Sequence, residues 1–183
     1  MKLRLWNMLL ILGIWSEISM ADVSKRKIKA ITQSFHQQFL NHLDALGIEP
    51  SQEKMDQFKG FRFYRHSGDL RKFSFIDPGG VEANIGFCLK KTTSEGQENF
   101  VFINTASFKN SADARRKLQP LVFHELLHCL LDQDHDESHK GLMASNFHLN
   151  DSKSPAESVR SLVRELRRIK RSQQNLLVKF IRR

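Results

Sequence analysis

The segment His124-Glu125-Leu126-Leu127-His128 combines residue types and spacing that suit metal chemistry. On a helix, two imidazoles four residues apart project from one face and can share a single zinc ion. Glu125 would lie about 100° around the helix from His124, so its carboxylate can reach a water on the metal rather than the ion itself. The spacing therefore predicts a catalytic zinc centre in which Glu125 is the general base.

Two histidines on an apolar helix can instead be core residues held by hydrogen bonds. The residues around this pair are almost all apolar: Leu121, Val122, Phe123, Leu126, Leu127, Leu130 and Leu131. In such surroundings each imidazole or carboxylate without a partner would cost ~1 to 3 kcal/mol of desolvation. A metal ion supplies the missing partner, so we favour the metal site over a purely structural role.

A catalytic zinc ion needs a third protein ligand, and two candidates follow the motif closely. His135 lies seven residues after His128, and Asp134 lies six residues after it. Both come after a polar Asp132-Gln133 step, where the helix can end and the chain can turn back over the ion. Imidazole is the commoner neutral zinc donor, which favours His135 and leaves Asp134 as the alternative.

The segment HELLHCLLDQDHD, followed by Gly141-Leu142-Met143-Ala144, resembles the metzincin clan of zinc endopeptidases. In that clan an HExxHxxGxxH helix is followed by a turn with a methionine beneath the metal. The chain is still more similar to small exported bacterial metzincin-like proteins. These have a HELGHC core, an aspartate-histidine pair, an S-I-M-type turn and an upstream I-G-x-C strand, which Ile85-Gly86-Phe87-Cys88 matches.

The resemblance covers most of the chain up to about Phe147 and implies hydrolysis of internal peptide bonds in a protein or peptide substrate. It assigns the zinc ligands, the catalytic base and the turn methionine to His124, His128 and His135, to Glu125, and to Met143. Three positions depart from the metzincin pattern, and one of them is Leu127, which replaces the usual small residue inside the motif. Leu131 stands where those proteins have glycine, and their standard spacing would select Asp134, one residue before His135.

The elements that must position this centre follow from hydrophobic periodicity. Apolar residues at three- and four-residue spacing predict an amphipathic helix from Lys25 to Leu46. Between Phe58 and Thr105, short aromatic and β-branched stretches separated by turn residues predict a mostly antiparallel sheet of about four strands. These strands are expected at Phe61–Tyr64, Phe73–Ile76, Ile85–Leu89 and Phe100–Ile103.

Two further helices complete the predicted fold. A buried helix from about Ala112 to Leu131 carries the metal motif. The run Ser154-Pro155-Ala156-Glu157 has the residues of a helix start, with a capping serine, a proline in the first turn and a glutamate three residues after the cap. The expected fold class is therefore α+β, of zincin or metzincin-like type.

The first twenty-one residues have the features of a secretory signal. Lys2 and Arg4 precede an apolar run from Leu5 to Trp15, and Ser19-Met20-Ala21 forms a small-x-small cleavage site. A mainly apolar run of eleven residues is too short to cross a hydrocarbon core of ~30 Å. We expect a signal peptide at 1–21, a catalytic domain at 22–152 and a basic amphipathic helix at 153–183, with a periplasmic or secreted product.

The formal net charge of +9 is concentrated at the C-terminal end. Residues 22–152 hold seventeen basic and seventeen acidic residues, whereas 153–183 hold ten basic and two acidic ones. Such a helix can bind an anionic membrane or envelope surface, or it can pack on the domain with a solvated basic face. The leader and the lack of interleaved aromatic residues argue against nucleic acid as a partner.

The two cysteines are Cys88, in a predicted strand, and Cys129, beside His128. In an exported protein a bridge between them would join the sheet to the metal helix and stabilise the fold by up to roughly 4 kcal/mol. A pair of buried thiols fits the spacing equally well.

Two other functions are compatible with the pattern. The first is an inactive zincin-fold protein that keeps the metal and docks on an acidic partner through its basic helix. The second is a different HExxH hydrolase in which Glu157 or Glu165 completes the metal site. The only tyrosine, Tyr64, lies far from the motif along the chain, so the sequence identifies no donor to a developing oxyanion.

Overall fold

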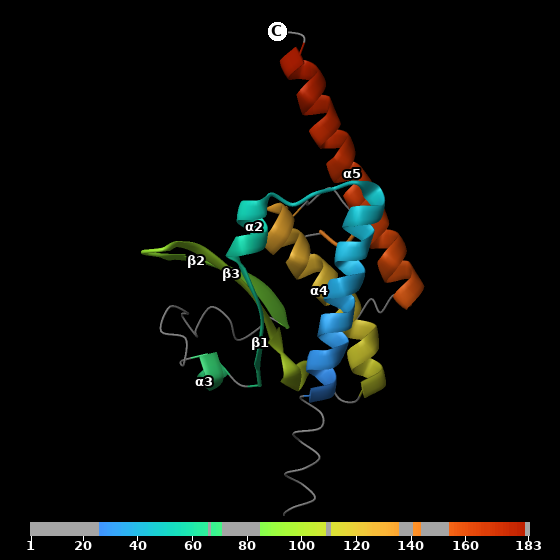
Figure 1. Cartoon of the computed structure of the whole chain (residues 1–183). Coiled ribbons are helices and arrows are strands. Elements are labelled where there is room, and N and C mark those ends of the chain that lie inside the picture. The colour runs from blue at the N-terminus through green and yellow to red at the C-terminus, as the bar shows by residue number, and fades with distance from the viewer. Residues whose placement is uncertain are drawn as a thin grey trace, which may run out of the picture.

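The computed structural model describes residues 26–65, 67–70, 85–108, 111–135, 141–143 and 154–181 (Figure 1). The predicted signal peptide at 1–21 and the predicted strand at 73–76 lie outside these residues. After the N-terminal helix at residues 26–46, the elements are α2 (Gln52–Gln57), β1 (Phe58–Tyr64), α3 (Ser67–Leu70), β2 (Gly86–Thr93), β3 (Gly96–Asn104), the short 3-10 helix η2 (Thr105–Ser107), α4 (Ser111–Leu131) and α5 (Pro155–Ile181). The chain is therefore α+β, as predicted.

The described sheet has three strands in the order β1-β3-β2 rather than about four, and it is mixed. β2 pairs with β3 in an antiparallel hairpin that places Cys88 opposite Val101. β1 instead runs parallel to β3, so the prediction of a mostly antiparallel sheet is wrong for this pairing. Strand periodicity depends on which residues are buried, and it carries no information about the direction of the neighbouring strand.

Alternate residues of β3 belong to two different hydrophobic clusters. Val101 and Ile103 are buried in the main core together with residues of the N-terminal helix, α4 and α5. Phe100 and Phe102 pack in a second cluster with Tyr64. Because successive side chains of a strand point to opposite faces, β3 is buried on both sides and forms the centre of the sheet.

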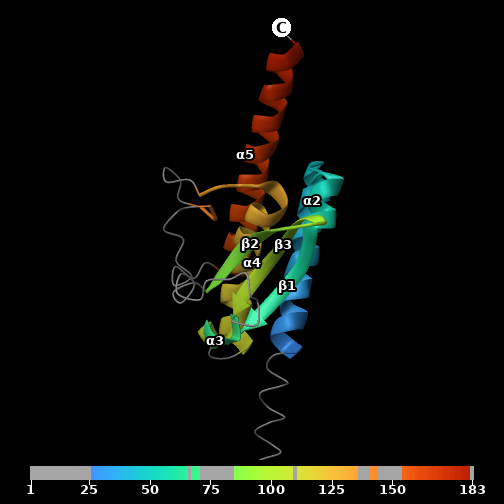
Figure 2. The same ribbon diagram turned by 90° about the vertical axis from the view of Figure 1, so that its left-hand side faces the viewer.

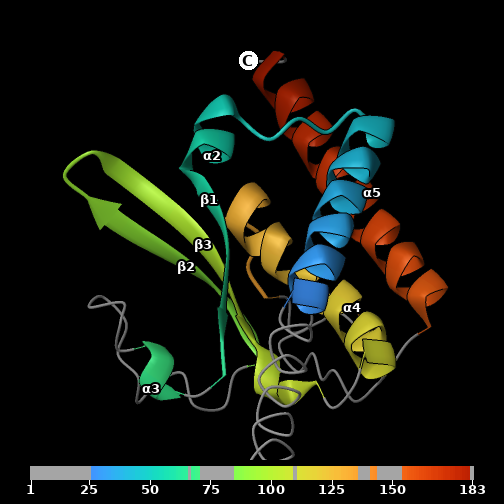
Figure 3. The same ribbon diagram turned by 60° about the horizontal axis from the view of Figure 1, so that its bottom comes forward.

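Helix α4 lies against β2 and β3 on one side and against α5 on the other (Figures 2 and 3). Its central side chains are almost completely buried, including those of Phe123, Leu126 and Leu127. Apolar residues on nearly every side of this helix therefore have a packing partner, as the sequence predicted. The helix ends at Leu131, the predicted residue, and Pro120 lies inside it.

Helix α5 begins as its sequence predicts and packs on the domain. The side-chain oxygen of Ser154 accepts from the backbone N–H of Glu157, and the Glu157 carboxylate accepts in return from the N–H of Ser154. Leu162, Leu166 and Ile169 of α5 are buried in the main core. The end of α5 extends beyond the other described elements (Figure 1). No helix in the described part of the chain is both long and apolar enough to span a bilayer.

Candidate metal centre

Three imidazoles converge at the C-terminal half of α4. His124 and His128 extend from consecutive turns of the helix, and His135 follows four residues after the helix ends. The separations between their Nε2 atoms are 3.2 Å for His124–His128, 3.3 Å for His128–His135 and 3.2 Å for His124–His135. The three nitrogens therefore form a nearly equilateral triangle around a common point.

This triangle has the dimensions of a three-nitrogen zinc site. With Zn–N bonds of about 2.0–2.1 Å, a tetrahedral site places its nitrogens about 3.3–3.4 Å apart. The separations of 3.2–3.3 Å between the Nε2 atoms are close to that value. An ion slightly above the plane of the three nitrogens would contact all of them and leave a fourth position open.

The other ring nitrogens of the two helix histidines fix which nitrogen faces the centre. Nδ1 of His124 donates to the carbonyl of Leu142, and Nδ1 of His128 donates to the carbonyl of Gln133. A carbonyl oxygen can only accept, so in the neutral rings both Nε2 atoms carry a lone pair and no proton. Carbonyl partners of this kind orient metal-binding histidines.

Protonation of His124 or His128 would not replace a metal ion between their Nε2 atoms, because both rings resist protonation. Burial lowers the pKa of His124 to about 3, because a charged ring is poorly solvated there. Burial also lowers the pKa of His128. Both rings are therefore neutral at neutral pH, and two facing lone pairs 3.2 Å apart repel unless a cation lies between them.

The turn after α4 explains how His135 reaches the centre. Leu131 is still helical, and the next residue, Asp132, adopts the left-handed conformation with φ of 49°. The N–H of Gln133 then bonds to the carbonyl of Leu127 at 3.1 Å, which turns the chain back along the helix. Compared with the HExxHxxGxxH spacing, the turn residue is Asp132 instead of position 131, and the third histidine is His135 instead of position 134. The distance along the chain from the turn to the histidine is therefore unchanged.

Asp132 suits this turn because aspartate tolerates the left-handed region better than most residues. Its carboxylate lies 2.8 Å from Nζ of Lys54 on α2 and 2.6 Å from Nζ of Lys90 on β2. Partial burial alone would raise the pKa of Asp132, but the hydrogen bonds from the two lysines lower it below its ordinary value. The start of the turn is therefore attached to both neighbouring elements.

The segment Gly141-Leu142-Met143 contacts His124 through the carbonyl of Leu142. Met143 is fully buried in the main core. A side chain at Gly141 would come within 2.6 Å of the carboxylate of Glu165 on α5, which is itself buried and pairs with Arg168 at 3.1 Å. Glycine therefore allows α5 to approach closely while the next residue, Leu142, presents its carbonyl to the histidine.

Glu125 is 4% exposed and points toward β2. Burial raises the pKa of its carboxyl group to about 8, and a hydrogen bond from the backbone of Cys88 partly opposes that rise. Burial and the nearby charge of Glu125 also raise the pKa of Tyr64 to about 12. Tyr64 is thus electrostatically coupled to the expected base, although it lies far away in the sequence.

A disulfide joins Cys88 to Cys129, with Cα atoms 5.7 Å apart. The spacing of the two cysteines left open a disulfide or a pair of buried thiols, and the structure has the disulfide. The carbonyl of Cys129 also accepts from the side-chain amide of Asn99, at 3.2 Å. Strands β2 and β3 are therefore both attached to the turn of α4 that carries His128.

The other candidate ligands are not part of the centre. Among the described residues, the group of ligand atoms that could hold one ion consists of His124, His128 and His135 and does not include Asp134. Glu157 caps α5, and Glu165 pairs with Arg168. The structure therefore gives no support to a glutamate ligand from the C-terminal helix.

Several groups around the centre carry no signal in the sequence. The carbonyls of Leu142 and Gln133 and the N–H of Cys88 are backbone groups, whose positions depend on the fold rather than on residue type.

Comparisons of the chain with protein-family models, curated proteins and solved structures find no significant match. The resemblance to metzincins therefore rests on the sequence motifs alone.

Proposed function

We propose that this protein is a zinc-dependent endopeptidase of metzincin-like type, with His124, His128 and His135 as metal ligands and Glu125 as general base. The observation that carries the proposal is the convergence of three Nε2 atoms at 3.2–3.3 Å from one another. A buried carboxyl group on the residue next to His124 supplies the second component that peptide hydrolysis needs.

Zinc held by three imidazoles would supply a fourth position for water, lower the pKa of that water to about 7 and polarise a substrate carbonyl. Glu125 would accept the proton of the attacking water and pass it to the leaving amine. Its pKa of about 8 in the metal-free protein is close to neutral pH, where a group can both accept and release a proton. The N–H of Cys88 would hold the carboxylate in place during this transfer.

An extended peptide is the substrate that the position of β2 supports. Within the described sheet β2 is an edge strand, and α4 packs against it. An edge strand offers unpaired backbone groups to which a peptide can add as a further strand. A peptide bound along β2 would thus pass the residue whose N–H contacts Glu125.

The decisive experiment compares the parent protein with Glu125→Gln. Zinc content would be measured by mass spectrometry of the metal, and cleavage would be followed on casein and on a peptide library. We expect one zinc ion per chain in both proteins and a loss of cleavage by about 10²- to 10⁴-fold in the variant, the usual contribution of a general base.

Glu95→Gln is a matched control, because Glu95 is exposed in the β2–β3 turn. This variant should keep both its zinc and its activity. A parent protein that holds zinc but cleaves nothing in the library would contradict the proposal. That result would favour a binding protein built on the same centre.

A further inference from the structure

Four exposed arginines form a row along α5. Arg160, Arg164, Arg167 and Arg171 follow one another at intervals of four, three and four residues, so they lie on one face of the helix. The row extends over roughly 16 Å at 1.5 Å per residue. A surface groove of about 650 Å³ runs along it, lined by arginine side chains and by Val159 and Val163.

Nothing in the described part of the chain neutralises this row. None of its four arginines has an ion pair or hydrogen bond to a described residue. The two acidic residues of α5 are used elsewhere, since Glu157 caps the helix and Glu165 is buried beside Gly141. Beyond its first turn, where the exposed Glu157 caps the helix, the described exposed face of α5 therefore carries basic but no acidic side chains.

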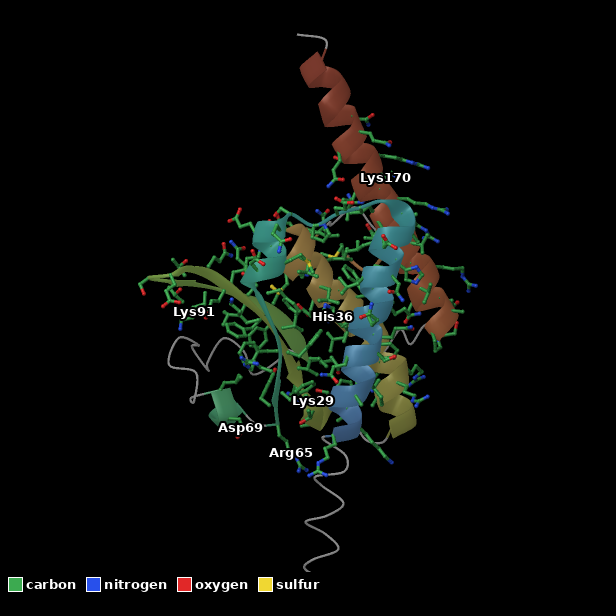
Figure 4. The ribbon with its side chains drawn as sticks, in the orientation of Figure 1. Lys29, His36, Arg65, Asp69, Lys91 and Lys170 are labelled. Atoms are coloured by element: carbon green, nitrogen blue, oxygen red, sulfur yellow. A yellow bond between two sulfur atoms is a disulfide. The ribbon has the colours of Figure 1, made fainter. Side chains whose placement is uncertain are left out.

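Lys170 shows the contrast between a structural cation and the arginine row. It lies where α5 passes the C-terminal end of the N-terminal helix (Figure 4). Its Nζ donates to the carbonyl of Leu46 at 2.5 Å and so satisfies one of the last carbonyls of that helix. This contact explains one basic residue of α5 through the fold, and no comparable contact explains the four arginines.

The apolar face of α5 is already occupied. Leu162, Leu166 and Ile169 are buried in the main core, on the side of the helix opposite the arginine row. The helix therefore cannot insert an apolar face into a bilayer without leaving the domain. Any partner of the row must be held mainly by charge.

We propose that the arginine row docks the protein on an anionic phospholipid surface. Charges spaced along a straight helix match a plane of many phosphates, whereas a site for one anion would bring the guanidinium groups to a single point. A protein partner would need an apolar centre in the interface, and the groove offers only two half-buried valines. No aromatic side chain on the described exposed face could stack on nucleic-acid bases.

Each basic residue near such a surface contributes about 1 kcal/mol, or roughly a fivefold change in partition. The test is sedimentation of the full chain with vesicles of phosphatidylcholine alone or mixed equally with phosphatidylglycerol. We expect binding only to the mixed vesicles and release when the salt concentration is raised from about 0.01 M to about 1 M. Arg164→Gln with Arg167→Gln should lower the partition coefficient by about 25-fold.

Lys27→Gln with Lys29→Gln is the matched control, because it removes two exposed charges from the N-terminal helix. It should change vesicle binding by less than about twofold, since those residues lie outside the row. Circular dichroism would establish that both double variants fold, and this readout does not depend on catalytic activity. Equal losses in the two variants, equal binding to neutral vesicles, or tighter binding to a DNA duplex at the same phosphate concentration would overturn the proposal.

Discussion

The backbone N–H of Cys88 donates a hydrogen bond to the carboxyl group of Glu125. The same cysteine is bonded through sulfur to Cys129, one turn further along α4. β2 is therefore attached to the metal helix by a covalent bond and also contacts the proposed base directly. The orientation of the Glu125 carboxyl group depends on where this strand lies.

Replacing both cysteines by alanine should therefore lower stability more than a typical core substitution. The bridge closes a loop with a sequence separation of 41, for which chain entropy gives about 4 kcal/mol of stabilisation. Urea unfolding of Cys88→Ala with Cys129→Ala should show a loss of about this size in the free energy of unfolding. An unchanged midpoint of unfolding would show that the packing of β2 on α4 suffices without the bridge.

The third ligand can be identified by comparing His135→Ala with Asp134→Ala. Of these two residues, only His135 has its side chain in the Nε2 triangle. Loss of a residue that merely hydrogen-bonds a metal ligand lowers metal affinity by up to roughly 100-fold, so loss of the ligand His135 should lower zinc affinity by more than that. Asp134→Ala should bind zinc like the parent protein. Competition with a chromogenic chelator measures both affinities, and a larger loss in Asp134→Ala would reverse the assignment.

Substitutions at Asp132 separate its backbone role from its charge. Asp132→Asn keeps a residue that tolerates φ of 49° and loses two partly exposed ion pairs, so it should cost no more than about 1 kcal/mol. Asp132→Val adds a β-branched side chain in the left-handed region, at a cost of about 1–2 kcal/mol for the backbone alone. Because that strain displaces His135, Asp132→Val should also weaken zinc binding, as measured by the same chelator competition.

Zinc affinity that is equal in Asp132→Val and in the parent would show that the turn does not position His135. A large stability loss in Asp132→Asn would instead show that the ion pairs to Lys54 and Lys90 outweigh the backbone conformation. Urea unfolding of the metal-free proteins distinguishes these two outcomes.

His36 should make stability fall in mild acid. Its ring packs edge-on against both Phe58 and Phe61, with centroid distances of 5.3 and 5.4 Å, and burial lowers its pKa below 6.5. The unfolded chain then binds more protons than the native protein. The stability that depends on neutral His36 is present above pH 6.5 and is lost as the pH falls from there through the folded-state pKa.

Urea unfolding of the zinc-loaded protein between pH 7.5 and pH 5 would measure this loss, with His36→Phe as the comparison. Phenylalanine keeps the aromatic contacts and cannot be protonated, so the variant should lose less stability over the same range. Parallel pH profiles for the two proteins would assign the acid sensitivity to other groups.

The elements that depend on nearby residues could be predicted from the sequence. The N-terminal helix, the end of α4 at Leu131 and the start of α5 at Pro155 all follow from periodicity and capping residues within a few positions. The arrangement of His124 and His128 also follows from helix geometry alone. These features are local, so the sequence by itself determined them.

Tertiary structure decided the features that join distant segments. The direction of β1, the carbonyls that orient His124 and His128, and the disulfide from Cys88 depend on how strands and loops pack around α4. The place of His135 in the triangle depends on a left-handed residue at Asp132, which the sequence allows but does not require. Residue types specify which local conformations are favourable, but contacts across the fold select among them.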